Sequence, residues 1–391
     1  MTIDLNRARR ETPGCTTVAH FNNAGAGLMP APVLDATIGH LRLEAEIGGY
    51  EAHDRQSALL DDLYDSAATL VNCRASEIAF VENATRAWDM AFYSLDFKPG
   101  DRILTAKAEY VSNYIAYLQV SRKTGAVVEV VDNDNHGQIS IAALEAMMDD
   151  RVKLISITHV PTNGGLVNPA AAVGRVARAA GVTYLLDACQ SVGQMPIDVE
   201  AIGCDMLSAT GRKYLRGPRG TGFLYVRQSL AYQLEPVFLD LRAAEWVADD
   251  RYDVVPGARR FENWESNVAG KIGLGVAMDY ALGWGLDAIR DRVVGLADGL
   301  RRRLGAMAGV TVRDLGVERC GIVSFSMAGH GAKAIAVAAA KQAINVSVSS
   351  VSSTRLDMAD RAPDGVVRAS VHYYNNDEEI DRLCAVVEGL A

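Results

Sequence analysis

Between residues 77 and 226, short runs rich in valine, isoleucine and leucine alternate with segments of helical spacing. Parallel strands need a crossover between them, so this alternation predicts an α/β fold in which helices cover both faces of a mainly parallel sheet. Ligands bind such sheets at the carboxyl ends of the strands, so the residues that follow each strand are the functional candidates. The seven predicted strands are 77–81, 102–106, 127–131, 153–159, 183–187, 205–210 and 222–226.

The alternation stops after residue 226, which indicates a change of architecture. We expect residues 228–262 to be irregular and residues 267–284 to form a long helix. The remaining segments favour a smaller C-terminal α/β unit, with strands at 310–313, 321–327 and 366–372 and helices at 332–343 and 377–390. The prediction is a large domain at 18–260, a small domain made of 1–17 and 285–391, and a connecting helix and dimer-contact segment at 261–284.

The charge balance argues against two classes of partner. Acidic residues number 48 against 39 basic ones, a net charge of −9, which is the wrong sign for binding nucleic acid or an anionic membrane. No segment approaches the ~18 uncharged apolar residues of a membrane span, and the first residues do not resemble a signal peptide. We therefore expect a soluble, cytoplasmic protein that binds neither nucleic acid nor membrane.

The six cysteines are scattered, without a CxxC pair or a cluster of histidine and cysteine. This spacing predicts neither a zinc site nor a disulfide framework, so we expect no bound metal and mostly buried, reduced thiols.

Asp187 and Lys213 form the most informative pair in the sequence. Asp187 ends an almost wholly apolar predicted strand, where a carboxylate is costly without a cationic partner. Lys213 follows the next predicted strand, so both residues should reach the same edge of the sheet. A buried acid with a lysine is most often a structural ion pair, but this one lies where α/β proteins bind ligands.

The segment from Tyr184 to Arg227 resembles the active-site signature of the class V aminotransferase family of fold-type I pyridoxal phosphate (PLP) enzymes. That family includes cysteine desulfurases, isopenicillin N epimerase-like proteins, kynureninase and carbon–sulfur lyases. The resemblance implies PLP as cofactor and an aspartate aminotransferase-like large domain that binds it. The matching residues are Asp187, Gln190, Thr210, Gly211, Lys213, Gly217, Pro218, Gly220, Gly222, Leu224 and Tyr225.

The resemblance also assigns roles within this signature. It implies that Lys213 forms the Schiff base with the cofactor, that Asp187 pairs with the pyridinium nitrogen, and that Gln190 bonds the ring oxygen. A carboxylate in a dry site keeps the ring nitrogen protonated, and a lysine amine can act as acid and base at the α-carbon.

Further cofactor contacts follow from the same resemblance. Tyr110, in a segment similar to the Glu-His-His-Ala-Asn of the desulfurases, would stack on the ring, although core packing is the alternative. The cofactor phosphate should lie at the helix N-terminus after the first predicted strand, where simple capping is the alternative. The implied phosphate contacts are Asn83, Ala84 and Thr85 at that helix, Thr210 and Arg212 beside the lysine, and Ser266, which would reach across a homodimer with shared active sites.

Substrate contacts are implied in three further segments. Arg368 matches the arginine that binds the substrate carboxylate, a role suited to its fork of donors. Thr162 or Asn163 lies in a loop that resembles the family segment at the amino-acid end of the substrate. Asn23 and Ala24 lie in a segment similar to the N-terminal substrate-side loop.

Cofactor binding does not select the reaction. Desulfurases carry a nucleophilic cysteine in a loop that aligns with residues 345–353, where this sequence has none, and Cys320 falls too early. This gap disfavours a persulfide-forming cysteine desulfurase. The motifs look most like carbon–sulfur lyases of the ergothioneine-pathway type, which predicts β-elimination from an S-substituted cysteine or its sulfoxide. The alternatives are an aminotransferase and an isopenicillin N epimerase-like racemase.

Overall fold

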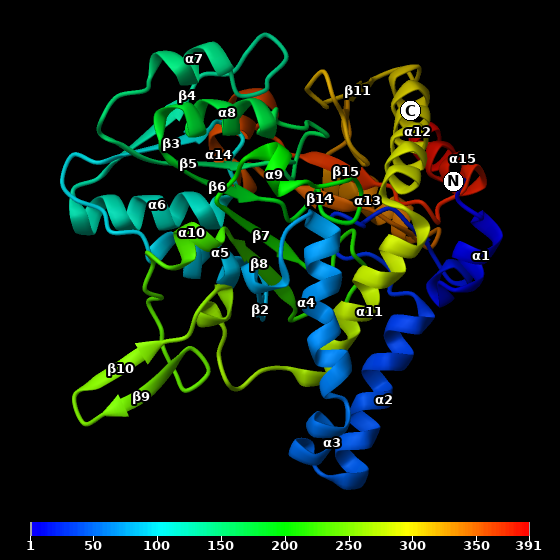
Figure 1. The fold of residues 1–391 in the computed structure, drawn as a ribbon. Helices are drawn as coiled ribbons and strands as arrows, with labels where there is room; N and C mark the ends of the chain where they lie inside the picture. Colours follow the sequence, from blue (N-terminus) through cyan, green and yellow to red (C-terminus); the bar gives the residue numbers. More distant parts are fainter. Residues whose placement is uncertain (1, 391) are drawn as a thin grey trace.

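A seven-stranded sheet forms the centre of the larger part of the molecule in the computed structural model, which describes residues 2–390 (Figure 1). All seven predicted strands are present in it, which confirms the predicted α/β fold. Their order across the sheet is β2-β8-β7-β6-β5-β3-β4. The strands are β2 (Ile78–Val81), β3 (Arg102–Ala106), β4 (Val127–Val131), β5 (Val152–Thr158), β6 (Thr183–Asp187), β7 (Met206–Thr210) and β8 (Gly222–Val226).

Only β8 runs against its neighbours in this sheet: it pairs antiparallel with both β2 and β7, whereas the remaining pairs are parallel. The carboxyl ends of β2, β3, β5, β6 and β7 therefore meet at one edge, as a mainly parallel sheet requires.

Both faces of this sheet are buried, because alternate residues of a strand enter different clusters. Ile78 and Phe80 pack into one cluster, and Ala79 and Val81 into another. This two-sided burial explains why the strands read as continuous apolar runs. The connecting helices are α5 (Ala84–Tyr93), α6 (Val111–Thr124), α7 (Ile141–Ala146), α8 (Ala170–Ala180), α9 (Val199–Ile202) and α10 (Gln228–Ala231).

Two of three N-terminal helices, α2 (Ala31–Ile47) and α4 (Ser57–Val71), pack beside the long helix α11 (Val268–Trp284), which was predicted at 267–284. The third, α3 (Gly49–Arg55), packs against α2. Asn267 caps α11 by accepting a hydrogen bond from the amide of Gly270 at 2.8 Å. Helices α2 and α3 project from the body of the molecule (Figure 1).

A four-stranded sheet of order β11-β12-β15-β14 forms the second, C-terminal α/β unit. All its pairs are antiparallel. A short parallel pair, β1 (Ala19–His20) with β13 (Ile344–Asn345), joins the N-terminal segment to it. Its strands are β11 (Val310–Val312), β12 (Ile322–Met327), β14 (Ser347–Ser349) and β15 (Val366–Ser370), and the helices of this part are α1 (Leu5–Arg10), α12 (Leu286–Gly305), α13 (Ala332–Ala340), α14 (Arg355–Arg361) and α15 (Asp377–Glu388). The predicted domain limits at residues 17, 260 and 285 stay predictions.

The segment 228–262 differs from the expectation of an irregular stretch. It contains α10 and an antiparallel hairpin of β9 (Ala244–Ala248) and β10 (Arg251–Val254), which projects from the body (Figure 1). Both strands are largely exposed, so their sequence lacks the apolar alternation that marks a half-buried strand.

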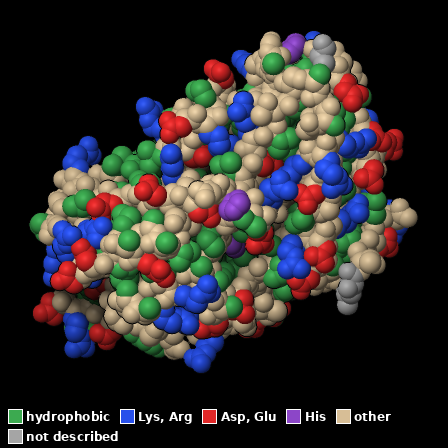
Figure 2. Space-filling view, turned by 90° about the horizontal axis from the view of Figure 1, so that it is seen from above, with side chains coloured by type: hydrophobic (Ala, Val, Ile, Leu, Met, Phe, Trp, Pro, Cys, Tyr) green, Lys and Arg blue, Asp and Glu red, His purple; other side chains and the backbone are tan. Residues whose placement is uncertain are grey.

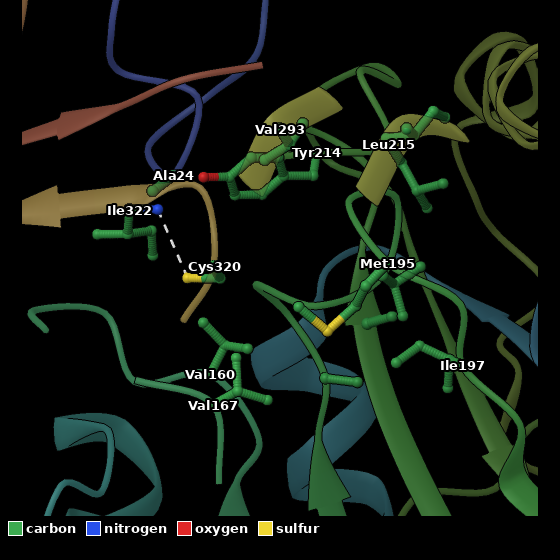
Figure 3. Packing of buried hydrophobic residues seen from close by; sticks show 14 of the residues in the cluster. Ala24, Val160, Val167, Met195, Ile197, Tyr214, Leu215, Val293, Cys320 and Ile322 are labelled. Carbon is green, nitrogen blue, oxygen red and sulfur yellow. Dashed lines mark hydrogen bonds between the residues drawn. The ribbon is translucent and has the colours of Figure 1, made fainter. Parts of the chain in front are cut away.

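The loops at the carboxyl edge of the large sheet pack against the smaller unit through apolar side chains (Figure 3). Val160 and Val167 follow β5, and Tyr214 follows β7; Ile322 begins β12. All four are almost fully buried. This contact fixes the loops that carry the candidate site relative to the smaller sheet.

Acidic and basic side chains are interspersed over the face seen in Figure 2, without a broad field of one sign. Within residues 2–390, no helix has the length and apolar character needed to cross a membrane.

Candidate active site

A cavity of about 180 Å³ lies at the carboxyl edge of the large sheet. It brings together residues that are far apart in the sequence and that follow β2, β3, β5, β6 and β7. The predicted site residues that line it are Asn83, Ala84, Thr85, Tyr110, Thr162, Asp187, Gln190, Thr210, Arg212 and Lys213; Thr158, Val160, Cys189 and Gly220 complete the lining.

Asp187 is 5% exposed at the end of β6. One carboxylate oxygen accepts the backbone N–H of Cys189 at 2.9 Å, and the other accepts the side-chain amide of Asn113 at 3.0 Å. The expected partner Lys213 lines the same cavity, but no ion pair within 4.0 Å joins the two. Hydrogen bonds from neutral donors hold this buried carboxylate instead.

Glu109 and Asn113 are buried contributors to which sequence reasoning gave no role. Glu109 accepts hydrogen bonds from the backbone amide of Tyr110 at 2.7 Å and from the amide of Asn113 at 3.0 Å. Burial raises the pKa of Glu109 from 4.5 to about 7, and the nearby charge of Asp187 adds to this rise. The sequence did contain an indication of their role, since both residues belong to the segment that resembles the Glu-His-His-Ala-Asn motif of the desulfurases.

Lys213 lies half-buried in the loop after β7. Burial penalises its charged form and lowers its pKa, although Asp187 and Cys189 oppose this effect. The loop is held in place by the N-terminal segment, because the amide of Gly27 donates to the carbonyl of Arg212 at 2.8 Å. The geometry presents an amine whose neutral, nucleophilic form is favoured.

Arg216 anchors the same loop through a buried side chain. Its backbone is left-handed, with φ of 62°, and its side chain is 1% exposed. The guanidinium donates to the carbonyl of Leu28 at 2.7 Å and to the hydroxyls of Tyr373 and Thr12, both at 2.5 Å. One buried cation thus ties the lysine loop to both ends of the chain.

The first turn of α5 forms one wall of the cavity. The side chain of Asn83 caps this helix by accepting the amide of Arg86 at 2.9 Å. The first-turn amides, including those of Ala84 and Thr85, have no acceptor within the helix and offer a place for an anion. A side chain at Gly222 would come within 3.1 Å of Ala84, so β8 can pack behind this turn only with glycine there.

Arg368, on β15 of the smaller sheet, does not line the cavity but contacts the lining residue Thr162. It is 7% exposed and donates to the hydroxyl of Thr162 at 2.5 Å and to the side-chain oxygen of Asn22 at 3.4 Å. Its Nε atom has no hydrogen-bond partner within residues 2–390. A free donor on a buried guanidinium can bind a carboxylate.

Gln190 donates to the carbonyl of Ala24 at 3.1 Å and to the hydroxyl of Thr162 at 3.3 Å, while its side-chain oxygen lacks a partner in the described chain. Asn163 and Asn23 do not line the cavity. Asn163 instead donates to the hydroxyl of Thr354 at 3.0 Å, and Asn23 donates to the carbonyl of Ser370 at 2.8 Å.

Tyr110 is half-buried at the N-cap of α6 and lines the cavity. Ser266 does not. It lines a separate cavity of about 590 Å³ with Leu41, Tyr50 and Trp264.

Cys189 is the one cysteine that lines the site cavity. Burial and the charge of Asp187 raise the pKa of its thiol, against the opposing charges of Lys213 and Arg212.

All six cysteines are free thiols. Residues 345–353, where the sequence lacks a cysteine, contain the end of β13, β14 and a short 3-10 turn. No group of three or more potential metal ligands occurs in the part of the chain that the structure describes.

A sequence model of the aminotransferase class-V family matches residues 19–383. A protein of Methanothermobacter thermautotrophicus named "Probable cysteine desulfurase" is 30% identical over 98% of this chain and 97% of its own length. A "Cysteine desulfurase" of Dickeya dadantii is 29% identical over 94% of this chain and 90% of its own length. The apo structure of a cysteine desulfurase from Thermococcus onnurineus covers all of this chain and 98% of its own, with a TM-score of 0.91 and 25% identity.

These relatives correct the expected reaction. The sequence disfavoured a persulfide-forming cysteine desulfurase and favoured β-elimination from an S-substituted cysteine, whereas the relatives are named cysteine desulfurases. Nothing in them supports the ergothioneine-pathway subgroup. A missing cysteine in one loop carries less information about the reaction than similarity along nearly the whole chain.

Proposed function

Since the chain belongs to the aminotransferase class-V family, whose members depend on PLP, we propose that it is a lyase-type enzyme that removes sulfur from cysteine. The observation that carries this proposal is the cavity in which Lys213, Asp187 and Gln190 meet, on a chain whose relatives are named cysteine desulfurases. Relatives alone supply the identity of the substrate.

The residues present fit the cofactor. The cavity combines an amine, a buried carboxylate and a helix N-terminus, which suit an aldehyde, a pyridine nitrogen and a phosphate. The partnerless oxygen of Gln190 provides a further polar contact that no described residue satisfies. We propose that Lys213 binds the aldehyde, Asp187 faces the ring nitrogen, Tyr110 covers the ring, and Thr85, Thr210 and Arg212 bind the phosphate.

Bound PLP supplies an aldehyde that bonds to amines and a ring that accepts electrons from the α-carbon. Asp187 would hold a proton at the ring nitrogen, because its carboxylate is buried and fixed by two donors. Lys213 would move a proton at the α-carbon of the substrate, since its lowered pKa favours the neutral amine. Arg368, held by Thr162, would bind the substrate carboxylate with its free donor.

The overall reaction balances with a thiol as sulfur acceptor. The Cβ–S bond of cysteine breaks, the sulfur passes to the thiol to form a persulfide, and the β-carbon takes a proton to give alanine. The raised pKa of Cys189 makes that thiol a weak nucleophile at neutral pH. We therefore propose that a small thiol from solution can serve as acceptor.

We also propose that the enzyme is a homodimer. Leu41 on α2, Tyr50 on α3 and Trp264 line one cavity, and they are 52%, 74% and 51% exposed. Large apolar side chains gathered on a surface mark a protein interface. The same cavity contains Ser266, so a second copy seated there would allow the expected contact of Ser266 with the partner's phosphate.

The decisive experiment supplies PLP-loaded protein with L-cysteine and dithiothreitol and measures alanine, pyruvate and sulfide. Alanine formed in proportion to the sulfide that dithiothreitol releases from the persulfide supports the proposal. Pyruvate and ammonia without alanine would overturn it, because elimination leaves the carbon skeleton as a 2-oxo acid. The negative control is the Lys213→Ala variant, which lacks the amine but keeps the other residues of the cavity.

A further inference from the structure

Glu109 is a buried carboxylate at the end of the loop that joins β3 to α6. It is 3% exposed and forms no ion pair with any described residue. Its oxygens accept hydrogen bonds instead. The donors are the backbone amide of Tyr110, the side-chain amide of Asn113, and the hydroxyls of Thr105, Thr158 and Tyr117. So many donors on one carboxylate fix its position and stabilise its charged form.

Asn113 joins Glu109 to Asp187. Its Nδ2 atom lies 3.0 Å from a carboxylate oxygen of Glu109 and 3.0 Å from a carboxylate oxygen of Asp187. An amide NH₂ group carries two hydrogens, so it can donate to both carboxylates at once. One buried amide therefore separates the two acids, and the position of each depends on the other.

The charged and titratable groups that face Glu109 are few. Asp187 approaches from β6 and Tyr117 from α6, whereas Thr105 on β3 and Thr158 on β5 are uncharged. Burial raises the pKa of Tyr117 well above its usual value, so it stays neutral. Glu109 is therefore the charged group that acts on Asp187 through this cluster. Because the pKa of Glu109 is about 7, this charge changes near neutral pH.

We propose that Glu109 is a positioning residue that, through the amide of Asn113, orients the Asp187 carboxylate and makes it a stronger partner for the ring nitrogen of the cofactor. A negative charge near Asp187 disfavours a second one, so it strengthens the hold of Asp187 on a proton. This inference rests on the proposed role of Asp187. It goes beyond that role because it assigns control of the nitrogen to a residue outside the cavity lining.

The test measures the ring nitrogen directly, by nitrogen-15 NMR of protein loaded with PLP labelled at that nitrogen. In the native protein we expect the nitrogen shift to change with an inflection near pH 7 as Glu109 gains or loses its charge. Glu109→Gln should remove this inflection and move deprotonation of the nitrogen to lower pH by about one unit or more. The matched control is Glu145→Gln, which removes the same charge from an exposed position on α7.

Two further variants separate the possible outcomes. Asn113→Ser keeps the charge of Glu109 but removes the bridging amide, so it should make the inflection smaller, and it serves if Glu109→Gln fails to fold. Asp187→Asn should shift the nitrogen to its unprotonated value at every pH. An unchanged shift in Asp187→Asn would contradict the proposed role of Asp187. Suppose instead that Asp187→Asn changes the nitrogen shift, while Glu109→Gln or Asn113→Ser keeps the pH dependence of the native protein. This result would overturn the role of Glu109 and leave the proposed role of Asp187 intact.

Discussion

Arg368 on the last strand of the smaller sheet donates a hydrogen bond to the hydroxyl of Thr162, which lies in the loop after β5 of the larger sheet. The contact joins the two α/β units at the candidate site. It leaves one donor of the buried guanidinium without a partner in the described chain, and it fixes the direction of that donor. Substrate binding is therefore expected to depend on both units at once.

Replacing Arg368 by lysine should raise KM for cysteine with little change in kcat. Lysine keeps the charge but loses the forked geometry, and hydrogen bonds to charged groups contribute about 1.5–3 kcal/mol, so KM should rise roughly tenfold to a hundredfold. Steady-state kinetics of alanine formation measures this. Arg355→Lys, at an exposed position on α14, is the control. A native KM in Arg368→Lys would exclude the carboxylate role.

Replacing Lys213 by alanine should abolish the visible absorbance of lysine-bound cofactor and lower kcat/KM by about 10²–10⁴-fold or more. The reason is that the cavity loses its only lysine. Absorbance after dialysis and the rate of alanine formation are the measurements. The exposed Lys341, just after α13, provides the control variant Lys341→Ala. Retention of covalently held cofactor in Lys213→Ala would place the attachment at another residue.

Glu109 should make the folded state less stable as pH rises. Its pKa is about 7 in the folded protein and 4.5 as the reference value, so between these pH values only the folded state holds the proton. This contribution is complete below pH 4.5 and is lost as pH passes 7, by an amount on the order of 3 kcal/mol. Urea unfolding at pH 5 and pH 8 measures it.

The Glu109→Gln variant carries no charge at this position, so its unfolding free energy should lack this pH dependence. Relative to the native protein, the variant should therefore be more stable at pH 8 than at pH 5. Glu145→Gln should show no such change. An equal difference at both pH values for Glu109→Gln would show that the folded and unfolded pKa values are alike.

Gly174 on α8 should tolerate no side chain. A Cβ atom there would lie 1.8 Å from the carbonyl oxygen of Ile202, so Gly174→Ala must push α8 and α9 apart. We expect a loss of about 1–3 kcal/mol or more in unfolding free energy. Gly283→Ala in α11 meets no atom within 4 Å and should be neutral or stabilising by up to about 1 kcal/mol. Equal midpoints for the two variants in urea would refute the steric argument.

The proposed dimer should dissociate when charge is placed on its apolar surface. Leu41→Asp and Tyr50→Asp introduce carboxylates on α2 and α3, which would be desolvated in the interface. Light scattering coupled to gel filtration should then give half the native mass. Val317→Asp, at a residue that is 70% exposed in the loop between β11 and β12, is the control. A native protein that already elutes as a monomer would contradict the dimer itself.

Much of the architecture could be predicted because it depends on local patterns. The strands of the large sheet are buried on both faces, so each reads as a short apolar run, and α8 shows clear helical spacing. The hairpin of β9 and β10 could not be predicted in the same way, because exposed strands carry no apolar alternation. The reaction could not be predicted from residues 345–353, because one loop without a cysteine does not decide how sulfur leaves the substrate.

The sequence by itself determined the strands of the large sheet, the family signature around Lys213 and the PLP dependence, since each strand and each motif is a local pattern in the chain. Only the tertiary structure decided that Asn113 joins Glu109 to Asp187, that Arg368 donates to Thr162, and that Arg216 is a buried anchor of the lysine loop. Side-chain hydrogen bonds connect residues from strands and loops far apart in the sequence. Their partners are fixed only when packing brings those segments together.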